Sequence, residues 1–286
     1  MKTLIRSDSS STIGLGHIMR DLVFAKTCEG EVLFACQPLE GNIIASIPYE
    51  VKILTTPHAD ELISLIQMLN IDLLVIDHYG IDATYEKAIK EATGVKILSF
   101  DDTYVPHHCD ILFNHNLYAD ATRYKTLVPK GCELRLAEPL IREEFHEEKK
   151  QHRTKHYDMF IAMGGTDASN ITLDILKTLP STKRLCVLTT TANAHLSELK
   201  TYVMDKPHIS LHVNSTQVAK LMHESEIAIV TPSVMVHEVL FLGIPFIAIK
   251  VASNQDDMSA YLKSNGYLTL DYLPLNFLNT IKAFIF

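Results

Sequence analysis

Short apolar runs rich in β-branched residues alternate with amphipathic runs along most of this chain. In the amphipathic run 59–70, apolar residues recur with the spacing of one helical face, so a wide face of that helix is expected to be buried. The apolar runs predict strands. In the first half the predicted strands are 3–7, 31–36, 49–54, 72–77, 95–100 and 111–115, and helices are predicted at 59–70 and 83–93.

The same alternation restarts after residue 156. The predicted strands of the second half are 157–165, 184–190, 209–213, 226–232, 245–251 and 267–272. Helices are predicted up to 178, around 194–204, at 216–223, 233–242 and 254–265, with a final helix at 276–286 that docks back on the body. Because the strands are apolar on both faces and alternate with helices, we expect parallel sheets covered by helices on each side.

Between the halves, the segment 143–158 is charged, rich in histidine and poor in β-branched residues. We interpret it as a solvated linker or a bridging helix with a domain boundary inside it, which gives domains at 1–145 and 146–286. The expected fold class is α/β, with two Rossmann-like domains that face each other across a cleft. Ligands of such sheets bind beyond the carboxyl ends of the strands, and clefts between domains are favoured sites.

Composition narrows the class of protein. The 286 residues are 47% hydrophobic and 21% charged, which is ordinary for a globular protein, and the net charge of -8 argues against nucleic acid as a partner. The most apolar window, 233–252, contains His237, Glu238, Pro245 and Lys250, so it does not predict a membrane span, and the N-terminus lacks the apolar core of a signal peptide. The five cysteines include no C-x-x-C pair, so we expect reduced, buried thiols in a cytoplasmic protein.

The segment SDSSSTIGLGHIMRD, residues 7–21, places an imidazole directly after a glycine-containing loop, where a helix begins. Gly14 and Gly16 let the backbone approach a ligand closely, but the pattern matches neither the dinucleotide fingerprint nor a P-loop. The positive end of a helix disfavours the imidazolium, so we expect His17 to be neutral near pH 7, as a general base must be. Asp21, one turn later, could orient the ring. The alternative is that His17 only caps or packs.

A second stretch of interest is FIAMGGTDASN. A strand is predicted to end in Gly164, Gly165 and Thr166 just before a helix capped by Asp167 or Ser169. Such a strand–loop–helix arrangement cradles phosphates, because the glycines allow close approach and the helix N-terminus attracts anions. Gly-Gly turns are common in α/β proteins, so an ordinary turn is an equally weighted alternative.

A third stretch, 231–255, combines a predicted helix with the start of the next one. Ser233 is positioned to cap a helix that carries Glu238 on its second turn. A carboxylate only accepts hydrogen bonds, so Glu238 matches the two hydroxyls of a ribose. Asn254 and Gln255 begin the following helix, where amide donors and the helix terminus suit an anion.

Two further motifs contain histidine. Asp77, His78 and Tyr79 come at the carboxyl end of the strand 72–77, where the ligand of the first domain is expected. His78 is either a second base or a satisfied loop histidine, and we favour the second interpretation. The motif PHHCD at 106–110 resembles a metal cluster, but adjacent histidines and a nearby cysteine do not easily share one tetrahedral zinc, so we expect no metal there.

Together, RSDSSSTIGLGHIMRD, IDHYG, LIREEF, MGGTD and the C-terminal NQ resemble the PseG family over nearly the whole chain. These proteins are UDP-2,4-diacetamido-2,4,6-trideoxy-β-L-altropyranose hydrolases of pseudaminic acid biosynthesis, related to the MurG-type glycosyltransferases with the GT-B fold. The resemblance implies that His17 is the catalytic base and that UDP is held mainly by the second domain, without a metal or another cofactor. The expected substrate-binding residues are Asp8, Gly16, Tyr79, Gly164, Gly165, Thr166, Ser233, Glu238, Asn254 and Gln255.

The resemblance also implies a reaction, in which water attacks the anomeric carbon with inversion and C–O cleavage, as a step toward flagellin glycosylation. The expected partners are the UDP-sugar substrate and the UDP product, with no nucleic acid and no membrane, and we expect a monomer. From the residues alone, two alternatives stay open: a MurG-like inverting glycosyltransferase with a sugar or lipid acceptor, and a nucleotide-sugar-binding protein without turnover.

Overall fold

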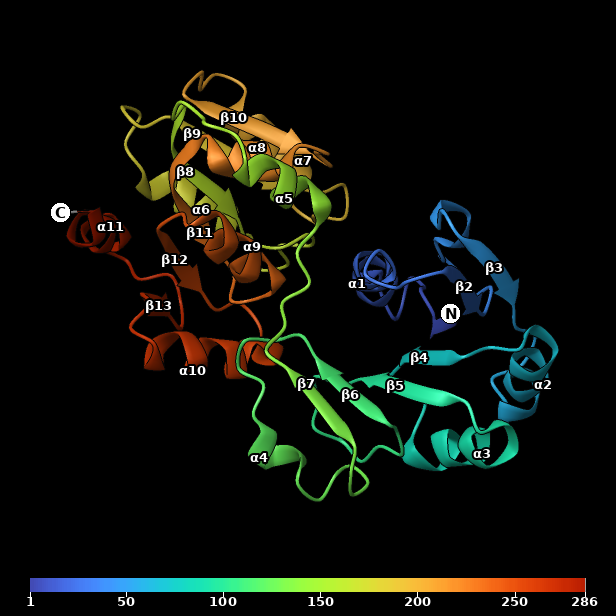
Figure 1. Cartoon of the computed structure of the whole chain (residues 1–286). Coiled ribbons are helices and arrows are strands. Elements are labelled where there is room, and N and C mark those ends of the chain that lie inside the picture. The colour runs from blue at the N-terminus through green and yellow to red at the C-terminus, as the bar shows by residue number, and fades with distance from the viewer. Residues whose placement is uncertain (286) are drawn as a thin grey trace. The chain divides into compact units, whose positions relative to one another are not determined.

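The computed structural model of the chain describes residues 1–285 (Figure 1). They form two α/β units: unit 1 spans Met1–Leu140, and unit 2 begins at Ile141. Each unit contains one parallel sheet with helices packed on it, which confirms the α/β class and the pair of sheet domains predicted from the sequence. Within residues 1–285, no helix has both the length and the apolar character needed to cross a membrane.

Unit 1 is built on a seven-stranded parallel sheet. The strands are β1 (Lys2–Ser7), β2 (Glu31–Cys36), β3 (Glu50–Ile53), β4 (Leu73–Asp77), β5 (Lys96–Phe100), β6 (Ile111–Asn114) and β7 (Glu133–Leu136). Their order in the sheet is β3-β2-β1-β4-β5-β6-β7. The direction in which strands are added reverses between β1 and β4, and this switch point is where ligands of doubly wound sheets bind, beyond the carboxyl ends of the strands.

The edge strand β7 is absent from the sequence prediction. Its four residues, ELRL, are all exposed or half-buried, and polar and apolar side chains alternate along it. Such a short strand lacks an apolar run, so only its pairing with β6 defines it. The six strands that were predicted for this half are confirmed.

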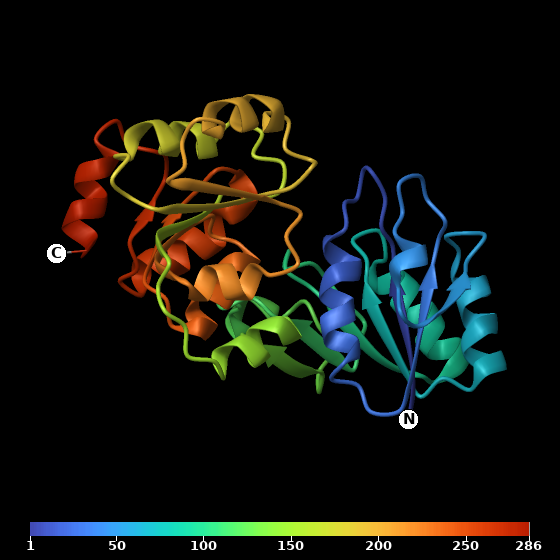
Figure 2. The ribbon, with the colours of Figure 1, turned by 90° about the horizontal axis from the view of Figure 1, so that it is seen from above.

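Helices cover both faces of the unit 1 sheet. They are α1 (Gly16–Ala25), α2 (Ala59–Leu69), α3 (Ala83–Thr93) and the short α4 (Ala121–Tyr124), with a 3-10 turn at Ile44–Ser46. Leu4 packs in a core with residues of α2 and α3, whereas its neighbour Ile5 packs in a second core with residues of α1. Successive strand residues point to opposite faces, so both faces of the sheet are buried. Figure 2 shows α1 and α2 on opposite sides of this sheet.

Unit 2 is built on a six-stranded parallel sheet. Its strands are β8 (Tyr157–Ala162), β9 (Leu185–Thr189), β10 (Ile209–Val213), β11 (Ser225–Val230), β12 (Phe246–Ile249) and β13 (Thr269–Leu270). All six were predicted, although β13 is shorter than expected. The order is β10-β9-β8-β11-β12-β13, so the switch point of this sheet lies between β8 and β11.

The helices of unit 2 include the predicted C-terminal helix. They are α5 (Glu143–Lys149), α6 (Ile171–Thr178), α7 (Leu196–Val203), α8 (Val218–His223), α9 (Val234–Leu242), α10 (Asp256–Ser264) and α11 (Phe277–Ile285). In α11, Phe277 and Ile281 are buried in the same core as residues of α6 and α7. The prediction that this helix docks on the body is therefore confirmed.

Neither interpretation of 143–158 holds for the whole segment: its first part is a helix, but one that packs within unit 2, and only the run 149–154 is exposed throughout. This segment begins with α5, which packs against α8 and α9 of unit 2. Phe145 is fully buried, and Glu148 is buried with an ion pair to Arg153. The division between the units lies just before α5, at Leu140 and Ile141. The charge of the segment misled the prediction, because two of its side chains support packing rather than solvation.

The cysteines are free thiols, as predicted. Cys36, Cys109 and Cys186 are buried, whereas Cys28 and Cys132 are half-buried. The Sγ atoms of Cys109 and Cys132 lie 3.8 Å apart on the segments that lead into β6 and β7.

Candidate active site

The loop that follows β1 positions His17. Ser10 and Gly14 exchange two backbone hydrogen bonds, so the loop folds back on itself before α1 begins at Gly16. Gly14 has a φ of 85°, a conformation that residues with a side chain rarely adopt. The tight loop therefore delivers the first turn of α1 to the carboxyl ends of β1 and β4, which is the switch point of unit 1.

His17 is oriented by Asp77 at the end of β4. Its Nδ1 atom lies 2.6 Å from Asp77 Oδ1. The sequence suggested Asp21 for this role, and that suggestion is wrong: Asp21 is fully buried and makes no hydrogen bond to the ring. Asp21 lies one helical turn away on the same chain segment, whereas Asp77 is brought to the ring by the pairing of β1 with β4.

The contact with Asp77 fixes which nitrogen of His17 can act as a base. An ionised carboxylate only accepts hydrogen bonds, so the 2.6 Å contact puts the proton on Nδ1 and the lone pair on Nε2; the longer 3.2 Å approach of Arg20 Nη2 to Nδ1 is then not a hydrogen bond. Although burial opposes it, the positive charge of Arg20 holds the pKa of Asp77 well below its usual range, so Asp77 is ionised at neutral pH. Among the residues the structure describes, Nε2 has no hydrogen-bond partner, yet this atom is not fully buried. It is available to a water molecule.

Arg20 and Tyr79 complete a network around this pair. Arg20 donates to both oxygens of Asp77 and, at 2.8 Å, to Asp102 Oδ2. The Tyr79 hydroxyl donates to Asp102 Oδ1 at 2.9 Å, and its ring packs edge-on against the His17 ring with centroids 4.6 Å apart. Tyr79 is 65% exposed, so it presents much of its ring to a ligand.

The His17 side chain is largely buried. It is only 7% exposed, because Asp77 holds one edge of the ring and Tyr79 packs against it. Gly16, immediately before it, is exposed. The packing interpretation of His17 accounts for its burial but not for a polar Nε2 that has no protein partner.

A second histidine–carboxylate–arginine set lies at the same strand ends. Asp8 is buried and receives a two-pronged ion pair from Arg6, at 2.6 and 2.8 Å, together with the Gln37 N–H. His78 Nε2 lies 3.1 Å from Asp8 Oδ2, and His78 Nδ1 accepts the Gly80 N–H at 3.0 Å. Both nitrogens of His78 are used, so it is a satisfied loop histidine, as favoured from the sequence. Asp8 was predicted to bind substrate. In the structure its buried carboxylate instead binds Arg6, His78 and the Gln37 N–H.

The motif at 106–110 is part of a polar cluster inside unit 1. His107 Nδ1 lies 2.8 Å from Glu86 Oε1, and Ser99 Oγ donates to the same carboxylate at 2.6 Å. Although burial opposes it, the hydrogen bond that His107 donates to Glu86 raises the pKa of His107. The described part of the chain holds no group of three or more His, Cys, Asp or Glu side chains arranged for a metal ion.

In unit 2, the residues predicted to bind nucleotide follow the carboxyl ends of neighbouring strands. Gly164, Gly165 and Thr166 follow β8 and are exposed, and Ser233 follows β11 across the switch point. Gly164 has a φ of 89°, which requires glycine, and the Gly165 carbonyl accepts a hydrogen bond from Thr190 at the end of β9. The parallel strands thus collect these residues at one edge of the sheet.

The N-terminus of α6, where a phosphate site was predicted, is capped by a side chain of the protein. Asp167 Oδ1 accepts the Ile171 N–H at 2.9 Å, and Oδ2 accepts the Thr172 N–H at 3.1 Å. Asp167 therefore caps α6, as one of the two predicted alternatives, and its carboxylate occupies the place that a phosphate would take. Ser169 has no such role.

The N-terminus of α9 is open instead. Ser233 occupies the N-cap position, but its side chain makes no capping bond and is paired with the Thr231 hydroxyl at 3.0 Å. In the part of the chain the structure covers, the N–H groups of Val234 and Met235 have no hydrogen-bond partner. Free N–H groups at the positive end of a helix, beside two hydroxyls at the switch point, suit an anion.

Glu238, on the second turn of α9, is held by an arginine that the sequence analysis did not single out. Arg142 donates to both Glu238 oxygens, at 2.6 and 3.0 Å, and also pairs with Glu144 at 2.7 Å. Glu238 is buried, and this burial raises its pKa despite Arg142. A carboxylate accepts about four hydrogen bonds, and Arg142 uses two of those that Glu238 can accept.

Asn254 and Gln255 lie in a 3-10 turn, Ser253–Gln255, just before α10 and not within it. Gln255 Oε1 accepts the Val251 N–H at 2.9 Å, so this side chain stabilises its own loop. Asn254 is exposed after β12 and is the one of the two that is free to reach a ligand.

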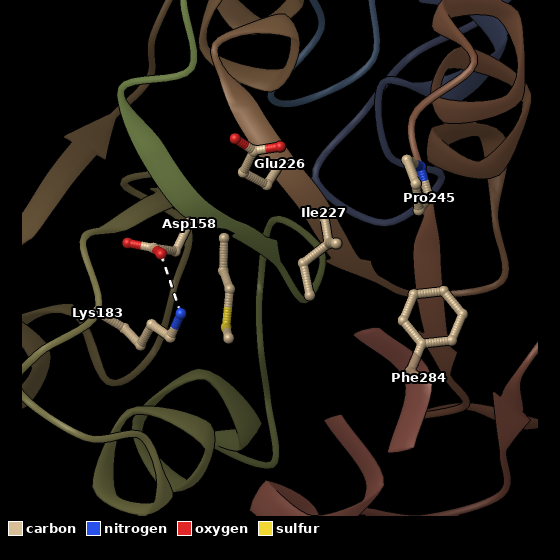
Figure 3. Close-up of a pocket in the computed structure, with 7 residues that line it drawn as sticks. Asp158, Lys183, Glu226, Ile227, Pro245 and Phe284 are labelled. Carbon is tan, nitrogen blue, oxygen red and sulfur yellow. Dashed lines mark hydrogen bonds and ion pairs between the residues drawn. The ribbon is translucent and has the colours of Figure 1, made fainter. Parts of the chain in front are cut away.

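A cavity of about 350 Å³ in unit 2 lies at the opposite edge of the sheet (Figure 3). It is lined by residues at the amino ends of β8, β11 and β12, among them Asp158, Ile227 and Pro245, and by Phe284 of α11. The Asp158–Lys183 ion pair, at 3.1 Å, borders it. Because nucleotides bind at the carboxyl ends of parallel strands, this cavity is separate from the edge where nucleotide binding is predicted.

The sequence analysis did not predict the roles of four charged residues: Asp77, which orients His17; Arg20, which pairs with Asp77; Asp102, which pairs with Arg20; and Arg142, which holds Glu238 in unit 2. One signal was present for Arg20, which follows His17 by one helical turn. Asp77 was noted at a strand end, but only strand pairing shows that it meets His17.

Comparison with known proteins adds a close relative. A protein of Campylobacter jejuni subsp. jejuni named UDP-2,4-diacetamido-2,4,6-trideoxy-beta-L-altropyranose hydrolase is 49% identical over 269 residues, which make up 93% of this chain and 98% of the relative. No protein-family model matches the chain.

Solved structures share the fold. MurG of Acinetobacter baumannii superposes with a TM-score of 0.66 and 13% identity, over 99% of this chain and 91% of that chain. Alr3699/HepE of Anabaena, in complex with UDP, gives a TM-score of 0.66 and 11% identity, over 100% of this chain and 90% of that chain. At such identities the likeness shows the fold alone, which is GT-B. The family follows from the sequence identity: this chain belongs to the UDP-2,4-diacetamido-2,4,6-trideoxy-β-L-altropyranose hydrolases.

Proposed function

We propose that this protein releases UDP from UDP-2,4-diacetamido-2,4,6-trideoxy-β-L-altropyranose by the attack of water, with His17 as the general base. The observation that carries the proposal is the Arg20–Asp77–His17 arrangement at the switch point of unit 1. Asp77 holds the ring in the tautomer that leaves Nε2 as the base, and Nε2 has no protein partner among the described residues. A histidine held in this way accepts a proton from water and gains a stabilised positive charge.

In the proposed reaction, water attacks the anomeric carbon, Nε2 of His17 takes a proton, and the C–O bond to UDP breaks. Attack opposite the leaving group inverts the anomeric centre. UDP leaves as a stable anion, so the main requirement is stabilisation of the growing phosphate charge rather than a strong acid. Tyr79, exposed beside His17, is proposed to contact the sugar, with Gly16 allowing its close approach.

We assign the nucleotide to unit 2. The free N–H groups at the start of α9, with Ser233, are proposed to hold the diphosphate, and Glu238 the ribose. Gly164, Gly165, Thr166 and Asn254 border the same sheet edge. This proposal moves the diphosphate from α6, which Asp167 caps, to α9.

Incubation with the UDP-sugar alone tests this function. Without metal and without an acceptor, NMR should show the release of UDP and the appearance of the inverted anomeric proton. In water labelled with ¹⁸O, the label should enter the sugar. Label in UDP would contradict C–O cleavage, UDP release only after an acceptor is added would indicate a transferase, and binding without UDP release would indicate a binding protein.

Glu238→Ala tests the ribose assignment. We expect wild-type protein to bind UDP about 10- to 100-fold more tightly than 2′,3′-dideoxy-UDP, the range for hydrogen bonds to a charged group, and the variant to bind both equally. Isothermal titration calorimetry of the four combinations gives this difference. Glu144→Ala is the matched control, because Glu144 also pairs with Arg142. Equal preference for UDP in the Glu238→Ala variant and wild type would refute the assignment.

We further infer that the protein works in the cytoplasm as a monomer and that its product feeds pseudaminic acid synthesis for flagellin glycosylation. The family supports the pathway, and the five free cysteines support a reducing compartment. Light scattering of the purified protein checks the monomer.

A further inference from the structure

Asp21 is a fully buried acid next to the proposed catalytic pair. It lies on α1 one turn after His17, and it is 0% exposed. Within residues 1–285, neither of its oxygens has a hydrogen-bond partner of ordinary geometry; the Ser7 hydroxyl acts on it as a donor and lowers its pKa, but burial raises that pKa by more. A fully buried carboxylate with so little hydrogen bonding is strongly unfavourable, so the ionised form does not fit this position.

The charges around Asp21 also disfavour its ionised form. Asp77 on β4 faces it, and Arg20 and His17 lie on its own helix. On the β1 and β2 side, the ion pair of Arg6 with Asp8 and the thiol of Cys36 lie nearby; burial raises the pKa of Cys36 to about 12, so that thiol is neutral. Arg6 and Arg20 are each already paired with another carboxylate. The charge of Arg20 does favour ionised Asp21, but this effect is smaller than those of burial and of Asp77.

Asp77 has room for one more donor. Its Oδ1 receives His17 Nδ1 and Arg20 Nη2, and its Oδ2 receives Arg20 Nε. These are three of about four hydrogen bonds that a carboxylate accepts. A proton on Asp21 would turn its unpartnered oxygen into a donor, and Asp77 is an acceptor that interacts with it. The buried Ser7 hydroxyl also faces Asp21, and a hydrogen bond from it favours the carboxylate, but this effect is smaller than those of burial and Asp77.

We propose that Asp21 carries a proton in the resting enzyme and donates a hydrogen bond to the Asp77 carboxylate, which makes Asp21 a positioning residue for the Asp77–His17 pair. Burial and the negative charge of Asp77 both raise the pKa of Asp21, in agreement with this assignment. The fourth hydrogen bond fixes the Asp77 carboxylate and limits how strongly it attracts the proton of the ring. The effect on turnover rests on the proposed function of His17, whereas the proton on Asp21 does not.

Infrared difference spectroscopy of the full chain measures the proton directly. At pH 7, the wild-type spectrum minus that of Asp21→Asn should contain the carbonyl stretch of a protonated carboxyl group. Asp60→Asn, which removes an exposed acid on α2, should give no such band. Absence of the band from the Asp21→Asn difference would overturn the proposal, because it would mean that Asp21 is ionised.

Kinetics of UDP release then separate positioning from simple packing. Asp21→Asn keeps a neutral side chain that can donate, so it should retain most of the turnover and the pH profile of kcat/KM. Asp21→Leu keeps the branched shape but is larger and has no donor, and kcat should fall about 10-fold with KM unchanged. Without the donor, Asp77 attracts the ring proton more strongly, so the acid limb of kcat/KM should move to higher pH. Asp21→Ser is the second variant if Asp21→Leu does not fold, because it is small and keeps a hydroxyl donor; it should preserve the wild-type acid limb.

The outcomes are distinguishable. An acid limb that moves to lower pH in Asp21→Asn would mean that a negative charge had been removed, and it would overturn the proposal. Equal loss of turnover in Asp21→Asn and Asp21→Leu, without any shift of the profile, would indicate packing alone and would also overturn it. If His17→Asn were fully active while the infrared band was present, the proposed function would fail and the proton on Asp21 would stand.

Discussion

Replacement of His17 by asparagine is expected to lower the turnover of the UDP-sugar by about 100- to 10,000-fold, the usual contribution of a general base. Asparagine has a similar reach, and its side chain can still contact Asp77, but it cannot take a proton from water at neutral pH. Because the nucleotide is assigned to unit 2, the affinity for UDP should stay within the error of calorimetry. The rate of UDP release under saturating substrate is the measurement.

The control for this variant is His58→Asn. His58 is an exposed histidine of unit 1 that precedes α2, far along the chain from the switch point. Its replacement should leave turnover unchanged. Turnover by His17→Asn close to that of the control would show that water is activated by another group, and His17 would then be a packing residue.

Replacement of Asp77 by asparagine should have an effect of similar size on turnover, about 100- to 10,000-fold. Asparagine offers one oxygen and one NH₂ group where Asp77 offers two acceptors to His17 and Arg20. An NH₂ group facing Nδ1 favours the tautomer with its proton on Nε2, which cannot act as the base. The loss should therefore appear in kcat, with little change in KM.

The same variant should be less stable. Asp77 is buried, and its loss leaves the largely buried Arg20 with Asp102 as its remaining partner, so we expect a decrease of about 3 kcal/mol in the free energy of unfolding. The pKa of Asp77 lies below its unfolded value, so its contribution is present at neutral pH and is lost as the pH falls through the folded pKa. Urea titrations at pH 7 and pH 3 should show a smaller difference between variant and wild type at the lower pH.

Asp60→Asn serves again as the control, since it removes a carboxylate without a buried partner. A variant Asp77→Asn with nearly full turnover would mean that the ring needs no carboxylate to present Nε2. A loss of turnover that followed only the fraction of unfolded protein would assign Asp77 to stability and not to the proposed chemistry.

Most strands and helices could be predicted from the sequence, because they depend on local patterns of apolar and polar residues. The apolar runs that became β1, β4 and β8 are continuous, as strands buried on both faces must be. The one missed strand, β7, and the wrongly assigned segment at α5 have weak or charged patterns, and pairing or packing with distant residues decides their structure.

The position of His17 was also available from the sequence, because a glycine loop between a strand and a helix is a local feature. Its partner was not. Asp21 is closer along the chain, and helical spacing made it a reasonable choice. The structure instead places Asp77 against the ring, 60 residues away, through the register of β1 with β4.

The same contrast holds in unit 2. The sequence identified Gly164 to Thr166 and Ser233 as strand-end residues, and adjacent parallel strands gather them at one edge. It could not tell which helix terminus stays open, since this depends on where single side chains lie: Asp167 turns onto α6, whereas Ser233 pairs with Thr231 and leaves α9 uncapped. Hydrophobic periodicity and turn residues act over a few neighbouring residues, so they can be recognised in the sequence. Which charges and hydrogen-bonding groups meet across strands depends on strand register and burial, and only the folded chain sets these.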